Sequence, residues 1–174
     1  PILDKYIDEL TFVGMKNTVC RFSDMQKKDM GLAFQKHYCL LNWQQGSGKT
    51  GVLYHFGKYQ LYRNMVKNVV IVAPSIAVHM TWEVFLKYNK EDYVLISKPE
   101  HLDKIPQGKF IIISVSMLGK VDRALRSFMK KLSQKVCLLF DESDELTNDV
   151  ALRTKRTLKC FRRAKFKMLG TGTT

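Results

Sequence analysis

The chain has 174 residues, of which 45% are hydrophobic and 26% are charged, ordinary values for one globular domain with a buried core. No apolar run approaches the roughly 20 residues that a membrane-spanning helix needs. The net charge of +13 predicts attraction to polyanions, with nucleic acid ahead of an anionic membrane surface. A basic surface kept only for solubility is the alternative. The lack of a long amphipathic basic helix argues against the membrane.

The cysteines and histidines show no metal-binding or disulfide pattern. No CxxC pair occurs, and two cysteines lie inside apolar runs, so we expect buried thiols in a reducing compartment: Cys20, Cys39, Cys137 and Cys160. The histidines lack metal spacing, and we treat each as structural: His37, His55, His79 and His101. We therefore expect an intracellular protein, cytoplasmic in a bacterium or phage, or nuclear in a eukaryote. The chain starts at Pro1 and stops at Thr174, which suggests part of a larger protein.

The first third of the chain predicts two helices, a strand and a third helix. The first 20 residues have apolar side chains at helical spacing, and we expect residues 1–21 to form a helical extension before a main domain of residues 22–174. Ser23 or Asp24 can cap a second helix that runs to about residue 34. A strand over residues 38–43 then enters a glycine-containing loop, and an apolar-periodic stretch over 52–63 predicts a helix.

Strands and helices alternate through the rest of the chain. Continuous apolar runs predict strands over residues 68–73, 93–96, 109–114, 135–140 and 166–169. Helices are predicted between them, over residues 75–88 with Ser75 as the cap, 121–132 and 150–163. This alternation predicts an α/β fold, a doubly wound and mostly parallel sheet with helices on both faces. Ligands of such sheets bind at the carboxyl ends of the strands.

The loop after the first strand of the main domain has the composition of a phosphate-binding loop. Its residues are Gln45, Gly46, Ser47, Gly48, Lys49 and Thr50. Glycines let backbone N–H groups approach phosphate oxygens, and the following helix adds its positive N-terminal end. Lys49 can then reach the β- and γ-phosphates, and the Thr50 hydroxyl can bind Mg²⁺. Trp43 stands where the usual pattern has glycine, and a structural glycine-rich turn is the alternative.

A second motif places two carboxylates at the end of a buried strand. The apolar run from Val136 leads directly into Asp141 and Glu142. In a nucleotide hydrolase the first acid holds Mg²⁺ and the second polarises the attacking water. A solvated acidic loop is the alternative for this motif alone. Together with the phosphate loop it predicts a site that hydrolyses a nucleoside triphosphate.

The order and spacing of these motifs resemble motifs I, II and III of superfamily 2 helicases, most closely the Swi/Snf-like branch. The resemblance covers residues 22–174 and adds Asp144 to the acidic box and Thr171 to Thr173 as motif III. Gln26 lies about where the family places the glutamine that contacts adenine. Pro74 and Ser75 resemble motif Ia, and Ser114 to Ser116 resemble motif Ib. Three residues depart from the family pattern: Trp43, Asp144 in place of histidine and Thr174 in place of proline.

The resemblance implies the ATP-binding lobe of a two-lobed, nucleic-acid-dependent ATPase. ATP and Mg²⁺ would bind between this RecA-like lobe and a second lobe that supplies arginine fingers, typically worth about 10³ to 10⁵ in rate. We therefore expect this chain alone to bind ATP–Mg²⁺ weakly and to hydrolyse it poorly. Asp144, Thr171 and Thr173 would couple the γ-phosphate to the nucleic-acid face.

The expected nucleic acid is double-stranded DNA. The protein would bind its phosphates, and the affinity would fall as the salt concentration rises. The contacts would come from Pro74, Ser75, Ser114 and Ser116, with added charge from Lys87, Lys120, Arg123 and Arg126. Ser75 and Ser114 can equally be a plain helix cap and a strand end. Trp82, Phe85 and Tyr88, at helical spacing, are expected in the core rather than stacked on bases.

Three other functions remain to be weighed. A motor subunit of a restriction or viral helicase would share the same motifs. A nucleotide-gated binding module without catalysis is the second, but Lys49, Thr50, Asp141 and Glu142 are all present. A P-loop kinase is the third, and no acceptor site or lid is recognisable in the sequence.

Overall fold

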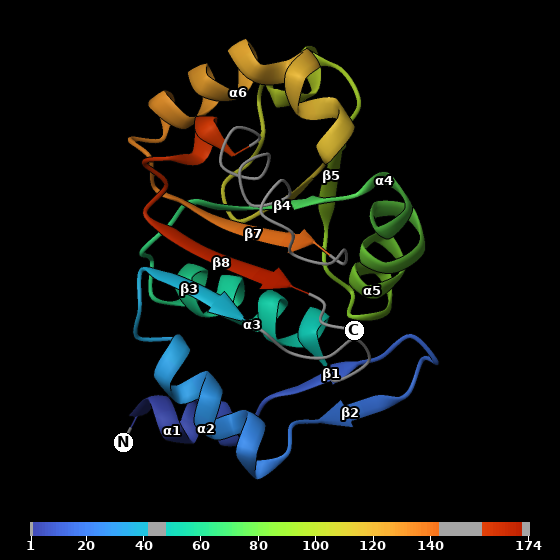
Figure 1. The fold of residues 1–174 in the computed structure, drawn as a ribbon, viewed down its shortest axis with the longest axis vertical. Coiled ribbons are helices and arrows are strands. Elements are labelled where there is room, and N and C mark those ends of the chain that lie inside the picture. Colours follow the sequence, from blue (N-terminus) through green and yellow to red (C-terminus); the bar gives the residue numbers. More distant parts are fainter. Residues whose placement is uncertain (1, 42–47, 143–157, 172–174) are drawn as a thin grey trace.

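The computed structural model describes residues 2–41, 48–142 and 158–171. Its centre is a six-stranded sheet in which every pair of neighbouring strands is parallel, in the order β3-β8-β7-β4-β6-β5 (Figure 1). The strands are β3 Tyr38–Leu41, β4 Asn68–Ala73, β5 Tyr93–Ile96, β6 Phe110–Ser114, β7 Val136–Glu142 and β8 Phe166–Thr171. The predicted parallel α/β fold is confirmed.

Helices cover both faces of this sheet because its strands are apolar on both sides. On one face lie α3 (Lys49–Tyr62) and a continuous helix of residues 75–88; on the other lie α6 (Leu118–Lys131) and the 3₁₀ turns η2 (Pro99–Leu102) and η4 (Lys159–Phe161). Alternate side chains of β4 divide between the two cores, Val69 and Ile71 toward α3, Val70 and Val72 toward α6. All four are fully buried.

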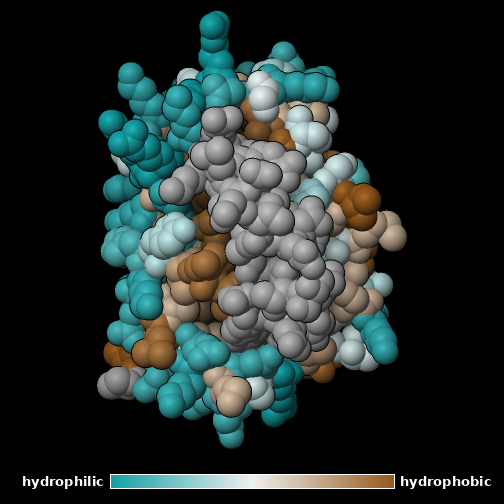
Figure 2. Space-filling model, viewed as in Figure 1, coloured by the Kyte–Doolittle hydropathy of each residue, from teal (hydrophilic) through white to brown (hydrophobic). Residues whose placement is uncertain are grey.

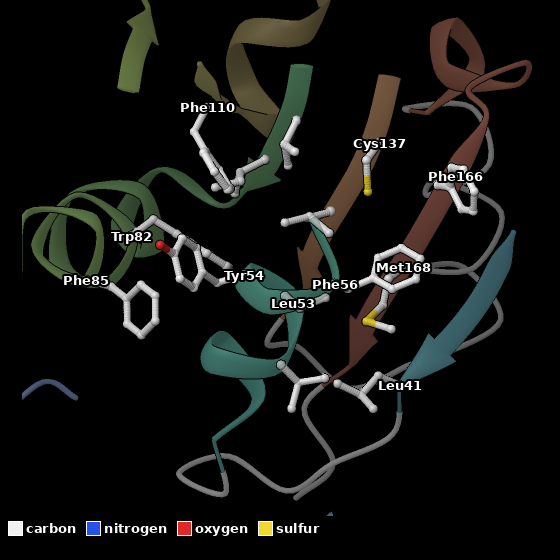
Figure 3. Packing of buried hydrophobic residues seen from close by; sticks show 14 of the residues in the cluster. Leu41, Leu53, Tyr54, Phe56, Trp82, Phe85, Phe110, Cys137, Phe166 and Met168 are labelled. Atoms are coloured by element: carbon white, nitrogen blue, oxygen red, sulfur yellow. The ribbon is translucent and has the colours of Figure 1, made fainter. Parts of the chain in front are cut away.

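The helix of residues 75–88 consists of three segments, α4 Ser75–Ala77, the π-helical turn η1 Val78–Trp82 and α5 Glu83–Tyr88. Trp82 and Phe85 pack in the core with Tyr54 of α3 (Figure 3). Their predicted core position is confirmed, whereas Tyr88 is exposed, so that part of the prediction is wrong. Pro74, rather than Ser75, is the N-cap, and no side-chain hydrogen bond caps this helix.

The N-terminal segment is only partly helical. Helix α1 covers Ile2–Asp8 and packs on α2 (Asp24–Ala33), but residues 11–21 form an antiparallel hairpin of β1 (Thr11–Val13) and β2 (Val19–Arg21). The prediction of a helix through residue 20 is therefore wrong. A β-branched and aromatic strand leads into a turn where Gly14 N–H donates to the Thr18 carbonyl and Asn17 has a positive φ of 56°. These residue types favour a turn over a continued helix.

The other predicted strands and helices agree with the structure where it describes them, apart from the last helix. Ser23 is confirmed as the N-cap of α2, in a capping box with Gln26. The helix predicted over 150–163 lies mostly outside the described residues, and its described end is the short turn η4. Cys137 and Cys160 are buried as expected, but Cys20 and Cys39 are only partly buried because they lie on the hairpin and on edge strand β3. Within the described ranges, no helix has the length and hydrophobicity to cross a membrane.

Candidate nucleotide site

The phosphate loop ends at Gly48, whose backbone conformation favours glycine over other residues. Gly48 has φ +88° and ψ 16°, the left-handed region, and is the N-cap of α3, which begins at Lys49. No side chain caps this helix end. The first N–H groups of a helix lack intrahelical partners, and the dipole makes this end positive. The start of α3 is thus suited to an anion.

Lys49 and Asp141 form a buried ion pair beside this helix end. Lys49 Nζ lies 2.9 Å from Asp141 Oδ1, and the two residues are 6% and 4% exposed. The Trp82 indole Nε1–H donates to the other oxygen, Asp141 Oδ2, at 2.9 Å. One carboxylate oxygen thus accepts a hydrogen bond from the indole, whereas the other has the ion pair with Lys49 and no hydrogen bond.

The ion pair opens onto a cavity of about 790 Å³ that is large enough for a nucleotide. Its walls come from the start of α3, from β7 through Asp141, from the helix of residues 75–88 and from the N-terminal hairpin. Gly48, Lys49 and Thr50 all line it, so the structure brings together the described phosphate-loop residues and the first acid.

The hairpin forms a wall of this cavity that the sequence did not predict. It contributes Phe12, Met15, Lys16 and Cys20. Phe12 packs so closely that a Cβ on Gly51 would lie 2.9 Å from its ring.

Two side chains fix the hairpin to the domain. Val13 N–H donates to Asn89 Oδ1 at 2.8 Å, and Asn89 Nδ2 returns a bond to the Val13 carbonyl at 3.0 Å. His55 Nε2 lies 2.8 Å from the Thr11 carbonyl oxygen. Burial lowers the pKa of His55, with a smaller lowering from Lys58 and an opposing effect from the carbonyl. His55 is therefore a neutral donor at pH 7.

The strand register places the third motif beside the acids. Asp141 pairs with Gly170 and Glu142 with Thr171 across β7 and β8. A Cβ on Gly170 would lie 3.1 Å from Lys49 Cδ, so the absence of a side chain there leaves room for the lysine. Gln26 also approaches the loop, because its Nε2 lies 3.8 Å from the position that a Cβ on Gly48 would take.

Several predicted site residues lie outside the described part of the chain. These are Gln45, Gly46, Ser47, Asp144 and Thr173, together with Trp43. For Glu142 and Thr171 the structure describes the strand backbone only. Their roles stay predictions.

The predicted nucleic-acid residues come together at the carboxyl ends of β4 and β6, the end of the sheet at which the nucleotide cavity lies. Ala73, directly before Pro74, pairs with Ser114 across β4 and β6. The hydroxyls of Ser114 and Ser116 are 3.2 Å apart, and Ser75 is exposed. Pro74 also lines the nucleotide cavity. The predicted nucleotide site and the predicted nucleic-acid site therefore adjoin at the carboxyl end of the sheet.

The sequence did not indicate that Trp82 contacts Asp141. The two residues are 59 positions apart, and helical spacing identified Trp82 only as a core residue. A buried indole N–H usually finds a hydrogen-bond partner. That rule could have prompted a search for an acceptor, but not the choice of Asp141.

Comparison with known proteins identifies the family and the fold of the chain. A model of the family described as "Type III restriction enzyme, res subunit" matches residues 7–174. A structure of the UvsW helicase from bacteriophage T4 is 16% identical with a TM-score of 0.69, covering 98% of this chain and 59% of that chain. A second structure of T4 UvsW is 14% identical with a TM-score of 0.70, covering 98% of this chain and 34% of that chain. The chain thus spans 59% or less of these relatives, and at such identities the likeness concerns the fold. The search of curated proteins found no match.

Proposed function

This chain belongs to the family described as the res subunit of type III restriction enzymes, as the ATP-binding lobe of a superfamily 2 helicase-like motor, and we propose that it couples ATP hydrolysis to movement on double-stranded DNA. The Swi/Snf-like branch is the finer assignment that its motifs favour. A second RecA-like lobe would complete the ATP site. The motor function belongs to the full-length protein.

The observation that carries the proposal is the buried Lys49–Asp141 ion pair at the start of α3. Burial of a charged lysine and carboxylate costs desolvation free energy that their attraction need not repay. A buried pair in a cavity is therefore a candidate for a functional role. Here they line a cavity of nucleotide size next to an uncapped helix N-terminus. When phosphate enters, Lys49 can exchange Asp141 Oδ1 for the β- and γ-phosphate oxygens.

The same residues fit a magnesium ion. Thr50 and Asp141 supply oxygens, the donor type that Mg²⁺ prefers, and both line the cavity. Mg²⁺ would neutralise charge on the transferring phosphate. Asp141 would hold the ion, usually through water, and Glu142 would orient and polarise the attacking water.

Nucleic acid would bind across the surface at the carboxyl ends of β4 and β6, which is formed by Pro74, Ser75, Ser114 and Ser116. Hydrophilic side chains gather over the neighbouring α6 (Figure 2), where the exposed residues include Lys120, Arg123 and Arg126. Arg126 also pairs with Asp122, at 2.9 Å, so its charge is partly balanced. These positions suit phosphate contacts without base recognition. Binding should therefore fall steeply as salt rises.

Nucleotide binding can be tested on the 174-residue chain itself. Titration with ATP and Mg²⁺ should show binding that Lys49→Ala weakens by tenfold or more, because the lysine contacts phosphate oxygens. Lys58→Ala, on the same helix but outside the cavity, is the matched control and should leave affinity unchanged. Equal affinity in wild type and Lys49→Ala would contradict a phosphate-binding role.

Coupling to nucleic acid requires the full-length protein. ATP turnover is measured without polymer and with duplex DNA, single-stranded DNA or RNA, using Glu142→Gln as the blank. Stimulation by duplex alone supports a double-strand translocase. Equal turnover under all four conditions would mean that nucleic acid does not regulate this ATPase.

A further inference from the structure

The hydrogen bond between Trp82 and Asp141 gives the tryptophan a place in the nucleotide site. Trp82 is fully buried, and its Nε1–H points at Asp141 Oδ2 across 2.9 Å. Lys49 occupies the opposite oxygen, Oδ1. A neutral donor fixed in the core thus holds one oxygen, and a flexible cation holds the other.

The helix geometry around Trp82 is unusual at this point. Glu83 N–H donates to the Val78 carbonyl, five residues back, which makes residues 78–82 a π-helical turn. Such turns are rare in proteins, and many of those known lie at functional sites. The turn ends at Trp82, so it coincides with the residue that reaches the carboxylate.

The indole cannot move easily out of this contact. Its ring lies in the core, 6.0 Å from the Phe85 ring at an angle of 68°, and close packing leaves few alternative rotamers. The Lys49 side chain, by contrast, has a long flexible stem and can swing to a phosphate. Exchange of the lysine would therefore leave the carboxylate held through Oδ2.

We propose that Trp82 is a positioning residue for the magnesium-binding carboxylate, keeping Asp141 Oδ2 occupied so that Oδ1 faces the cavity when Lys49 moves to the nucleotide. This inference rests on the proposed ATPase function. Without the indole, the carboxylate can rotate about its last side-chain bond and present either oxygen. Magnesium would then bind a mixture of orientations, and the water near Glu142 would be less well placed.

The catalytic test uses Trp82→Phe in the full-length protein, which removes the N–H but keeps an aromatic ring. Loss of a hydrogen bond to a charged acceptor corresponds to about tenfold or more in an equilibrium. We expect the Mg²⁺ concentration for half-maximal ATP turnover to rise about tenfold and kcat to fall, with thermal stability measured alongside. Phe34→Leu, which alters a fully buried ring that packs on Phe56 and does not line the cavity, should lower stability but leave the Mg²⁺ dependence unchanged.

A spectroscopic test is independent of turnover. In the 174-residue chain, Trp43→Phe leaves Trp82 as the single tryptophan, so one indole N–H resonance remains in a ¹⁵N-labelled sample. Asp141→Asn should shift this resonance upfield and speed its exchange with solvent, because the charged acceptor is lost.

The outcomes separate the inference from the function on which it rests. An indole resonance unaffected by Asp141→Asn overturns the inference even if the protein hydrolyses ATP. A Mg²⁺ dependence that Trp82→Phe leaves unchanged, or that Phe34→Leu shifts equally, also overturns it. Absence of ATP binding and turnover in the wild type would instead refute the proposed function.

Discussion

Replacing Lys49 with methionine should destabilise the fold as well as the nucleotide site. The substitution keeps a long apolar stem but removes the ammonium group that lies 2.9 Å from Asp141 Oδ1. Side-chain exposures of 7% and 6% leave little water to replace it. Breaking a buried pair in this way typically costs about 3–5 kcal/mol, because an uncompensated charge remains. Trp82 still donates to Oδ2, so we expect the lower end, about 3 kcal/mol.

The assay is urea unfolding of the 174-residue chain in a double-mutant cycle. Asp141→Asn alone leaves Lys49 buried without its partner, whereas the Lys49→Met/Asp141→Asn double variant removes both charges. The double variant should therefore recover much of the loss, with a coupling energy of roughly 2 kcal/mol, within the range seen for residues in contact.

The control is a second lysine on the same helix. Lys58 Nζ lies 3.1 Å from Glu91 Oε2, but its side chain is 40% exposed. Lys58→Met should cost no more than about 1 kcal/mol, because water reaches the ammonium of this pair. A Lys49→Met loss no larger than that of the control, with coupling near zero, would refute the inference that the Lys49–Asp141 pair supports the fold.

Three further predictions concern the scaffold. Gly57→Ala should lower the free energy of unfolding by about 1–3 kcal/mol, because the new Cβ would lie 2.9 Å from a valine methyl of β4, whereas Gly119→Ala in α6 meets nothing within 4 Å and should stabilise by about 0.5–1 kcal/mol; calorimetry that gives both the same sign would contradict this. Burial lowers the pKa of His55, so the unfolded chain binds the proton more readily and stability should fall as pH drops below about 6.5. Urea titrations from pH 7 to 5 should show a flatter pH dependence for His55→Gln, and an unchanged slope would count against it. Asn89→Ala removes both bonds to Val13, so hydrogen exchange of the Val13 amide should accelerate while strand β7 stays protected; simultaneous loss of protection in β7 would show global rather than local opening.

The boundaries of several elements were predictable from the sequence because they depend on short-range chemistry. Strand β4 was predicted over residues 68–73 because a continuous β-branched run ends at Pro74, and the structure has Asn68–Ala73. Ser23 was one of two predicted caps of α2, and the structure shows it as the N-cap, in a capping box with Gln26. Lys49 and Asp141 were predicted to share a site, because both follow strands at their carboxyl ends.

Only the tertiary structure decided which residues complete that site. The strand order brings β7 and β8 together and places Gly170 opposite Asp141, a pairing that no local pattern encodes. The hairpin at Phe12 and the indole of Trp82 reach the cavity from positions that periodicity assigned to a helix and to the core. Local sequence patterns determine where helices and strands form, because they depend on side chains close together in the chain. The partner of a buried polar atom depends on packing across the whole domain. The phosphate loop and the acid pair are therefore readable in the sequence, and the orientation of Asp141 is a property of the fold.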